Sequence, residues 1–593
     1  MTFDPFVLPF FLGLIFLLIV LFVRYSRWIA ALSADQKATL LRGINYMSIS
    51  YAIGEVFMES LIHRRMFRRN KLLGYMHMSF AFGWFLLILI GNIESRVYSG
   101  KHINPPYYPI FLKFFVHDKR VLPFELNTVP GIFRFLMDFV LLMILSGLVL
   151  ALFKRVRSKW FGLKKTSSFR PMDKLAISAL WLIFPLRLLA ESFTAGVYHG
   201  GGFLTNTLGH GLAHFLPLSQ LAYPAWWAYS LALGVFLIAM PWTRYMHIPT
   251  EVLLIFLRRF GLKTGDKLSS FSDIEVNSCP RCGVCIDVCQ MHSAAGEKNT
   301  MAVYFMRSVR EGLPIEKIAE TCLLCGRCLE VCPVQIDTNA IRIAHRLRNN
   351  TNGKQKFGYL RPAMLQKADV AYFAGCMGNL TPTVKNSMLS IFKHANVNAM
   401  MIDEGGTICC GRPLKIAGQL NASKELVTAN ENLIASTGAR ILVTSCPICY
   451  KSFKEDYHMG IEVLHHSQYL ERLANTGILN LSYSNQNVIY HDPCELGRGS
   501  GIYDEPRNLL KQIVNVQESP EERENGLCCG GSIGDLGLNP SQRKAITNDA
   551  LDLLLTRQTN LLITSCPLCK KTFSGSGRVE VKDIAELVAE SMR

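Results

Sequence analysis

The stretch "ILVTSCPICYKSF", residues 441–453, returns as "LLITSCPLCKKTF" at residues 561–573, with eight of the thirteen positions identical. Both copies are short apolar runs that end in a Cys-Pro-x-Cys turn. An accidental match between two apolar strands would not also repeat both cysteines, the proline and a lysine. The stretch therefore indicates an internal duplication.

The remaining cysteines of this region extend the duplication. Each copy holds a single Cys, then an adjacent Cys-Cys-Gly, then the Cys-Pro-x-Cys, and equivalent cysteines are 118 to 120 residues apart. Each set thus offers five thiols. The two sets are Cys376, Cys409, Cys410, Cys446 and Cys449, and Cys494, Cys528, Cys529, Cys566 and Cys569.

The residues around these cysteines predict an α/β repeat. "DVAYFAGC" and "NVIYHDPC" are β-branched or aromatic runs that end in a cysteine, and helical stretches such as "KELVTANENLIAS" separate them from the next such run. The cysteines should therefore gather at the carboxyl ends of parallel strands, where ligands bind in such sheets. We expect Gly411 and Gly530 to let the backbone approach a bulky group closely.

Five thiols predict a metal cluster in each repeat. Tetrahedral zinc needs only four ligands, and two adjacent cysteines strain around one small ion. An iron–sulfur assembly uses five thiolates more naturally. Disulfides are the other alternative, and the reducing cytoplasm, where the topology below places these residues, excludes them.

A second cysteine pattern precedes the repeats. The motif C-x2-C-x2-C-x3-C occurs twice, and three closely spaced thiolates hold one cubane cluster while the fourth reaches the other cluster. One departure is that Gln290 follows the first motif where Pro333 follows the second. We assign Cys279, Cys282, Cys285 and Cys332 to one 4Fe–4S cluster, and Cys322, Cys325, Cys328 and Cys289 to the other; zinc is the alternative.

The first 270 residues differ sharply from the rest. The chain has 593 residues, half of them apolar, a formal charge of +18, and all 18 cysteines beyond residue 270. Many Lys and Arg residues lie between long apolar runs, which favours membrane topology over nucleic-acid binding. Five runs are long enough to span a bilayer: Pro5–Val23, Leu72–Ile93, Ile132–Phe153, Leu175–Val197 and Pro224–Tyr245.

The charges of the loops predict the orientation. Residues 24–71 carry nine Lys or Arg and residues 154–174 carry eight, whereas the loop 94–130 is mixed in sign and residues 198–223 carry no charge apart from histidine. The positive-inside rule then places the N-terminus outside and the chain beyond residue 245 in the cytoplasm. The apolar first run lacks a cleavage site, so we expect an uncleaved anchor.

Two histidines lie at the cytoplasmic depth of this predicted bundle. His77 is near the start of the second span and His247 just beyond the fifth, so they are either the axial ligands of one b-type haem or two interfacial histidines. His199, His210 and His214 crowd the outer side, but no partner histidine lies in the facing spans, so we do not expect a second haem.

The fourth span carries Arg187 and Glu191, one helical turn apart. Charges at the bilayer centre are costly, so the two side chains should pair and face the bundle interior. They form either a structural ion pair or a quinone or proton site.

The chain resembles known proteins over nearly its whole length. The duplicated cysteine sets resemble the CCG domains of heterodisulfide reductase and related iron–sulfur oxidoreductases, which implies a non-cubane 4Fe–4S cluster in each repeat. The preceding module resembles the dicluster ferredoxin part of the catalytic chain of that enzyme. The five spans resemble its cytochrome b partner and the gamma subunit of respiratory nitrate reductase, whose haem-ligand histidines His77 and His247 match.

We therefore predict a multidomain protein. It comprises a five-helix membrane domain (1–260), an α-helical dicluster ferredoxin domain (270–350) and two α/β CCG domains (368–480 and 486–593). A fused chain of this kind resembles bacterial membrane oxidoreductases that link electron-transferring flavoprotein to quinone. The predicted cofactors are two cubane clusters, two non-cubane clusters and one b haem, in a protein of the prokaryotic cytoplasmic membrane that binds no nucleic acid.

Two other functions stay open. The CCG clusters could reduce a small-molecule disulfide with electrons from quinol, or the chain could be a relay component of a larger complex. No G-x-G-x-x-G follows a strand into a helix, so direct use of NADH is not expected.

Overall fold

The structure is a computed structural model that describes residues 4–99, 108–115, 129–156, 170–349, 365–406, 408–555 and 559–593. The loops 94–130 and 154–174 lie partly outside these ranges, as does residue 350, the expected end of the dicluster domain. The chain divides into two compact units. The first unit comprises Met1–Lys263, Ser269–Val284 and Pro333–Ile336; the second comprises Thr264–Leu268, Cys285–Cys332 and Asp337–Arg593.

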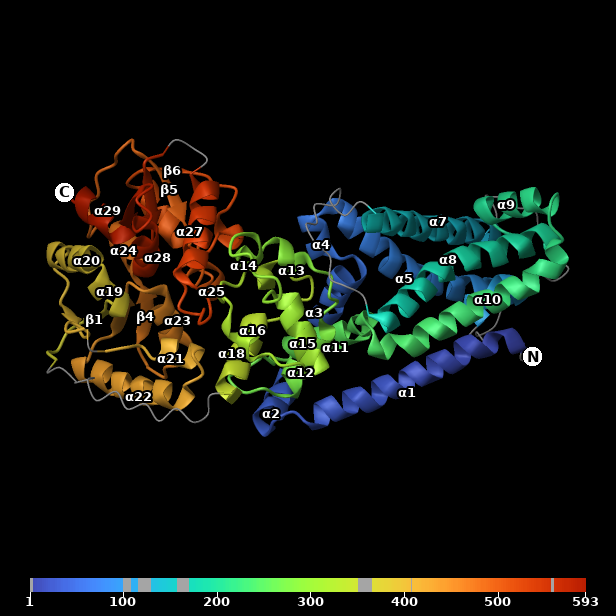
Figure 1. The fold of residues 1–593 in the computed structure, drawn as a ribbon, viewed down its shortest axis with the longest axis horizontal. Helices are drawn as coiled ribbons and strands as arrows, with labels where there is room; N and C mark the ends of the chain where they lie inside the picture. Colours follow the sequence, from blue (N-terminus) through green and yellow to red (C-terminus); the bar gives the residue numbers. More distant parts are fainter. Residues whose placement is uncertain are drawn as a thin grey trace. The chain divides into compact units, whose positions relative to one another are not determined.

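Five long apolar helices run side by side in the first unit (Figure 1). By length and composition, all five could cross a membrane, which confirms the predicted five-helix bundle. Helix α10 packs along both α1 and α8, and α5 packs along α7. The five are α1 (Leu8–Ala30), α5 (Lys71–Ser99), α7 (Val129–Val156), α8 (Pro171–Tyr198) and α10 (Leu218–Ala239).

Close packing within this bundle depends on small residues. A Cβ added to Gly13 of α1 would lie 2.9 Å from the Cα of Gly234 on α10. Such pairs of small residues let two helix backbones approach each other in apolar surroundings.

The fifth span was predicted to begin at Pro224, and this was wrong, because α10 begins at Leu218. Pro224 lies inside the helix, in its second turn, where the missing N–H removes one hydrogen bond near the helix end. The apolar pattern alone does not reveal this earlier, more polar turn.

Shorter helices complete the first unit, and the predicted helical dicluster module follows. The short elements of the first unit are η1 (Pro5–Val7), α2 (Ala34–Gly43), α3 (Tyr46–Glu55), η2 (Val56–Leu61), α4 (Arg64–Arg69), α6 (Tyr108–Phe115), α9 (Phe203–Ala213), η4 (Met240–Trp242), η5 (Arg244–Met246), α11 (His247–Arg259) and α12 (Ser270–Ser278). The remaining dicluster helices are α13 (Val284–Asp287), α14 (Gln290–Ser293), α15 (Ala302–Glu311), α16 (Glu316–Glu320), α17 (Arg327–Glu330) and α18 (Thr338–Asn349).

The duplicated region forms two parallel four-stranded sheets with the same topology. Their strand orders are β2-β1-β3-β4 and β6-β5-β7-β8. The central strands are buried apolar runs, as expected of parallel sheets covered by helices on both faces. The strands are β1 (Val370–Phe373), β2 (Ala399–Met401), β3 (Ile441–Thr444), β4 (Glu462–His465), β5 (Asn487–His491), β6 (Asn515–Gln517), β7 (Leu561–Thr564) and β8 (Glu580–Asp583).

The helices between these strands also repeat. The first repeat contains α19 (Cys376–Leu380), α20 (Pro382–His394), α21 (Arg412–Ile416), α22 (Leu420–Thr437), α23 (Pro447–Glu455) and α24 (His466–Asn475). The second contains α25 (Gly497–Ser500), α26 (Asp504–Lys511), η6 (Arg523–Asn525), α27 (Pro540–Leu554), α28 (Pro567–Ser574) and α29 (Ile584–Ser591). The duplication predicted from the cysteines therefore holds for the strand order and most of the helices, whereas α21 has no counterpart after the second Cys-Cys pair.

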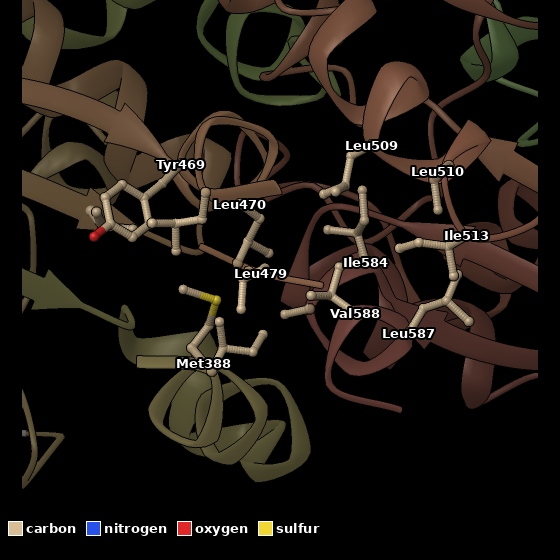
Figure 2. Close-up of a cluster of buried hydrophobic side chains, with 14 of the residues drawn as sticks. Met388, Tyr469, Leu470, Leu479, Leu509, Leu510, Ile513, Ile584, Leu587 and Val588 are labelled. Atoms are coloured by element: carbon tan, nitrogen blue, oxygen red, sulfur yellow. The ribbon is translucent and has the colours of Figure 1, made fainter. Parts of the chain in front are cut away.

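One apolar core joins the two repeats. Figure 2 shows Met388 and Leu470 of the first repeat in the same cluster as Leu510 and Ile584 of the second. Helix α20 packs on α29, and α24 packs on α26. Because neither repeat buries these faces alone, the pair should behave as one folding unit.

We expect Leu470→Ala to lower the free energy of unfolding of both repeats by about 2–5 kcal/mol, because it opens a cavity at a fully buried position. Protease cleavage of the full chain in detergent, followed as a function of urea, measures this. Leu389→Ala, at a 39% exposed position of α20, is the matched control. Loss of protection in the first repeat alone would contradict a shared core.

Candidate metal centres

The first CCG site gathers five thiols at the carboxyl edge of its sheet. Cys376 follows β1 and begins α19, and Cys446 follows β3, the neighbouring strand. The Cys410 thiol is hydrogen-bonded to those of Cys409 and Cys449, and Cys449 is hydrogen-bonded to Cys446. Cys376 is exposed and interacts electrostatically with Cys446 and Cys410.

The second CCG site repeats this arrangement. Cys528 is hydrogen-bonded to Cys494 and Cys529, and Cys569 is hydrogen-bonded to Cys529 and Cys566. Cys494 is less exposed than its counterpart Cys376. The structure thus brings together, at each site, all five cysteines that the sequence grouped.

The second thiol of each adjacent pair is the electrostatic centre of its site. Hydrogen bonds from the neighbouring thiols hold the pKa of Cys410 well below its usual value and lower the pKa of Cys529 to about 5. The same contacts, together with burial, raise the pKa of Cys449 and Cys569.

These buried thiols fit a polynuclear cluster. Several thiolates can be held in one apolar site only when bound cations compensate their charge, and metal coordination deprotonates the thiols outright. Five thiols per site exceed the four ligands that tetrahedral zinc takes, so the donor set favours an iron–sulfur cluster over zinc.

The glycines act differently from the sequence prediction. Gly411 and Gly530 have positive φ angles, but a Cβ there would meet α22 at Ser423 and α27 at Thr547, not the thiols. The expectation that they admit the cluster was wrong. Gly375, with φ of +82°, has that position instead, because its Cβ would lie 3.3 Å from Cys449 Sγ.

The second dicluster site lies wholly in the second unit. The thiol of Cys289 interacts electrostatically with those of Cys325, Cys322 and Cys328, so the structure brings the four assigned cysteines together. Burial raises the pKa of Cys328 to about 12, and its Sγ lies 3.2 Å from Thr338 Oγ1. Burial likewise raises the pKa of Cys289 and Cys325.

The cysteines assigned to the first dicluster site belong to different units. Cys279 and Cys282 lie in the first unit and interact with each other, whereas Cys285 and Cys332 lie in the second. The assignment of these four to one cluster stays a prediction.

A buried ion pair joins the Cys279–Cys282 loop to the apolar helix α8. Arg281 Nη2 lies 2.7 and 2.8 Å from the two carboxylate oxygens of Asp173, and the exposed fractions of the side chains are 4% and 0%. Asp173 Oδ1 also accepts a hydrogen bond from the backbone N of Arg244, three residues before His247. The sequence did not suggest Asp173, because nothing local marks its partner.

Three histidines lie near one another at this end of the bundle. His77 interacts electrostatically with His63 and His247, and the ring centroids of His63 and His77 are 5.5 Å apart. The Nδ1 atoms of His63 and His247 face the backbone carbonyls of Leu61 and Arg244. Burial lowers the pKa of His63 and so favours the neutral imidazole that binds metal. The sequence analysis missed His63.

A buried carboxyl lies one helical turn beyond His247. Glu251 is 8% exposed, and burial raises its pKa to about 8, so the carboxyl is mainly protonated at pH 7. Residues four apart share one face of a helix, so Glu251 and His247 lie together on α11.

The predicted pair in the fourth span is formed. Arg187 Nε lies 2.9 Å from Glu191 Oε1, and both side chains are buried. Tyr229 of α10 joins them, with its hydroxyl 3.5 Å from Arg187 Nη1. This tyrosine was not predicted, since only packing of α8 against α10 brings it there.

On the predicted outer side, His199 and His210 contact each other, with 3.4 Å between Nδ1 and Nε2. His199 begins the link to α9, and its φ angle is positive.

The cysteine sites correspond to known iron–sulfur domains. Residues 370–454 and 488–574 match the Cysteine-rich domain family (CCG), and residues 275–336 match the 4Fe-4S dicluster domain family. The chain therefore carries two CCG domains and a dicluster domain, together with five apolar helices that fit a membrane domain. It is similar to iron–sulfur oxidoreductases of the heterodisulfide reductase and EtfAB:quinone oxidoreductase type.

Particular relatives show the range of this type. One component of the dihydromethanophenazine:CoB--CoM heterodisulfide reductase of Methanosarcina acetivorans is 27% identical over 401 residues, covering 55% of this chain and 96% of that protein. EtfAB:quinone oxidoreductase of Syntrophomonas wolfei is 22% identical over 486 residues, or 62% and 68% of the two chains. One component of the fumarate reductase (CoM/CoB) of Methanothermobacter marburgensis is 26% identical over 363 residues, or 53% and 72%.

We expect Asp173→Ala to destabilise the first unit by about 3–5 kcal/mol, because it leaves the buried Arg281 guanidinium without its carboxylate. Thermal unfolding of the detergent-solubilised protein measures the change. Lys174→Ala, at the adjacent exposed position, should leave the transition unchanged. An unchanged melting temperature in Asp173→Ala would show that the ion pair is not required.

Proposed function

We propose that this protein carries electrons between a cytoplasmic redox partner, electron-transferring flavoprotein, and membrane quinone. The observation that carries the proposal is the Asp173–Arg281 ion pair, which bonds a cysteine loop of the dicluster motif into the membrane helices. This ion pair would hold the cysteine loop close to the helical bundle, as transfer of electrons between the iron–sulfur sites and the bundle requires. The similarity to EtfAB:quinone oxidoreductase supports the choice of partners.

The proposed cofactors are those that the donor sets fit. Two cubane 4Fe–4S clusters would be held by the dicluster cysteines, two non-cubane clusters by the CCG sites, and one b haem by His77 and His247. These groups supply one-electron chemistry, so two successive transfers match the two-electron carriers at either end. The residues around these groups would exclude water from the sites, hold the thiolates and fix the distances between the cofactors.

The polar cluster of Arg187, Glu191 and Tyr229 is the proposed quinone site. A quinone needs a hydrogen-bond donor at its carbonyl and a proton on reduction. Arg187 and Tyr229 offer donors, and Glu191 offers a carboxylate in the same buried group. We place the N-terminus outside and the iron–sulfur domains in the cytoplasm, where a soluble flavoprotein has access to them.

Membranes enriched in the protein should let reduced electron-transferring flavoprotein reduce a menaquinone analogue. Cys409→Ser and Cys528→Ser should abolish this transfer, because each removes a thiolate from one CCG site. Leu389→Ala, at an exposed position of α20, should retain the transfer. Spectroscopic reduction of the analogue under anaerobic conditions is the measurement.

Other outcomes would identify another function. Activity that requires an added thiol disulfide would favour quinol-driven disulfide reduction. Activity that appears only with stable partner proteins would favour a relay role. No response of any centre to quinones or quinols would overturn the assignment of the membrane half.

His77→Ala and His247→Ala should each abolish the b-haem absorbance and leave the iron–sulfur spectrum intact, since the proposed ligands of the clusters are cysteines. His63→Ala is the informative companion, because its ring stacks on His77. It should keep the haem and alter only its spectrum. Loss of haem in His63→Ala but not in His247→Ala would make His63 and His77 the ligand pair.

A further inference from the structure

Gln290 stands where the dicluster motif otherwise has proline. It follows Cys289, whereas Pro333 follows Cys332 in the second copy of the motif. Proline has no N–H and no polar side chain, while the glutamine amide can both donate and accept hydrogen bonds. Gln290 is 3% exposed, so its amide must find partners within the protein.

The side-chain amide of Gln290 bonds to the second CCG repeat. Its Oε1 accepts a hydrogen bond from the backbone N of Cys528 at 2.8 Å. Its Nε2 donates to the carbonyl of Cys528 at 3.3 Å and to Asp549 Oδ2 at 3.2 Å. Gln290, which follows the dicluster cysteine Cys289, thus bonds both the backbone N–H and the carbonyl of Cys528, a cysteine of the second CCG site.

The first repeat satisfies the same carbonyl differently. Cys409, the counterpart of Cys528, accepts at its carbonyl from Asn430 Nδ2 of its own repeat at 2.8 Å. The position equivalent to Asn430, 119 residues later, is Asp549, whose side chain has no N–H. The first repeat therefore supplies its own donor to the carbonyl of Cys409, whereas the carbonyl of Cys528 in the second repeat takes its donor from Gln290 of the dicluster motif.

A second contact joins the same two sites. Arg498 Nε donates to the carbonyl of Cys325 at 2.7 Å, and its Nη1 donates to Gly526 at 2.7 Å. Cys289, Cys325, Cys494 and Cys528 pack in one apolar cluster. The first repeat contacts the dicluster region at Arg346, whose Nη1 donates to the carbonyl of Ile416 at 3.1 Å and which also interacts electrostatically with the dicluster cysteine Cys322.

We propose that Gln290 is a positioning residue that couples the second dicluster site to the second CCG site, making Cys528 the entry point for electrons into the duplicated domains. The inference rests on the proposed function only in requiring that electrons pass between these sites. Electronic coupling is better through bonds and hydrogen bonds than across gaps, and the path from Cys289 through the Gln290 amide to Cys528 contains a single hydrogen-bonded step.

The transfer involves one electron and no proton at Gln290. An electron that moves toward the CCG domains oxidises the dicluster site by one unit and reduces the second CCG site by one unit, and the reverse direction exchanges these roles. No bond forms or breaks in the amide.

Three variants distinguish electronic coupling between the two sites from structural support of the Cys528–Cys529 pair. Gln290→Leu removes the amide. The double variant Gln290→Leu with Asp549→Asn places an asparagine at the position equivalent to Asn430. This asparagine can donate to the Cys528 carbonyl from within the second repeat, without a hydrogen bond from the dicluster motif. Gln542→Leu is the matched control, since Gln542 also joins these two parts, at Ala295 and Glu297, but contacts no residue adjacent to an assigned ligand.

The experiment uses the full chain in detergent, given less than one electron per molecule from methyl viologen radical. Rapid freeze-quench EPR then follows redistribution of the electron between the cubane and CCG signals. We expect redistribution to slow about ten- to hundredfold in Gln290→Leu and in the double variant. Any loss of the second CCG signal in Gln290→Leu should be reversed in the double variant. Gln542→Leu should change neither the rate nor the signals.

Wild-type redistribution in Gln290→Leu with all signals intact would overturn the proposal. Recovery of the rate in the double variant would show that Gln290 only supports the cysteine pair, and would also overturn it. Because the radical replaces both quinone and flavoprotein, failure of the proposed function leaves this test unaffected and is recognised separately in the menaquinone assay.

Discussion

The constraint that governs the cysteine-rich half of the chain is the burial of thiolates. A negative sulfur in an apolar interior is stable only beside cations or hydrogen-bond donors. The parallel sheets meet this by delivering cysteines from neighbouring strand ends to one edge, with the second thiol of each Cys-Cys pair at the centre. The polar groups around the pairs then hold the backbone: Asn430 and Tyr457 in the first repeat, Thr547 and Gln290 in the second.

Buried charge serves a different purpose in the first unit. Asp173 with Arg281, and Arg187 with Glu191, are almost wholly removed from water. Such pairs gain little net stability over apolar packing, but a lone partner is costly, so they fix which elements meet. The Asp173 pair fixes a cysteine loop against the start of α8 and the turn before His247. In the function that we propose, these contacts position the redox groups.

The duplication produced two CCG sites that share one fold but differ in the residues around their cysteines. The sheets, strand order and cysteine sets are equivalent, and one core joins the repeats. Yet a single exchange, Asn430 against Asp549, decides whether the repeat itself supplies the donor to the carbonyl of the first cysteine of its pair. The exposed Cys376 and the more buried Cys494 show the same divergence at the surface. Equal folds therefore do not imply equal roles in electron transfer.

The sequence by itself determined the duplication, the α/β repeats, the helical dicluster region and the five apolar helices, because these depend on local spacing and periodicity. It also grouped the thiols of both CCG sites and those of Cys289, Cys322, Cys325 and Cys328. Only the tertiary structure decided the early start of α10, the roles of Gly375 and Gly411, and the partners of Asp173, Tyr229, His63 and Gln290. Asp173 and Gln290 meet partners more than a hundred positions away, and Tyr229 lies on a different helix from Arg187, so no local pattern specifies which of many polar groups will be near. Gln290 is the clearest case: its departure from proline was visible in the sequence, but its meaning appeared only when folding brought it to Cys528.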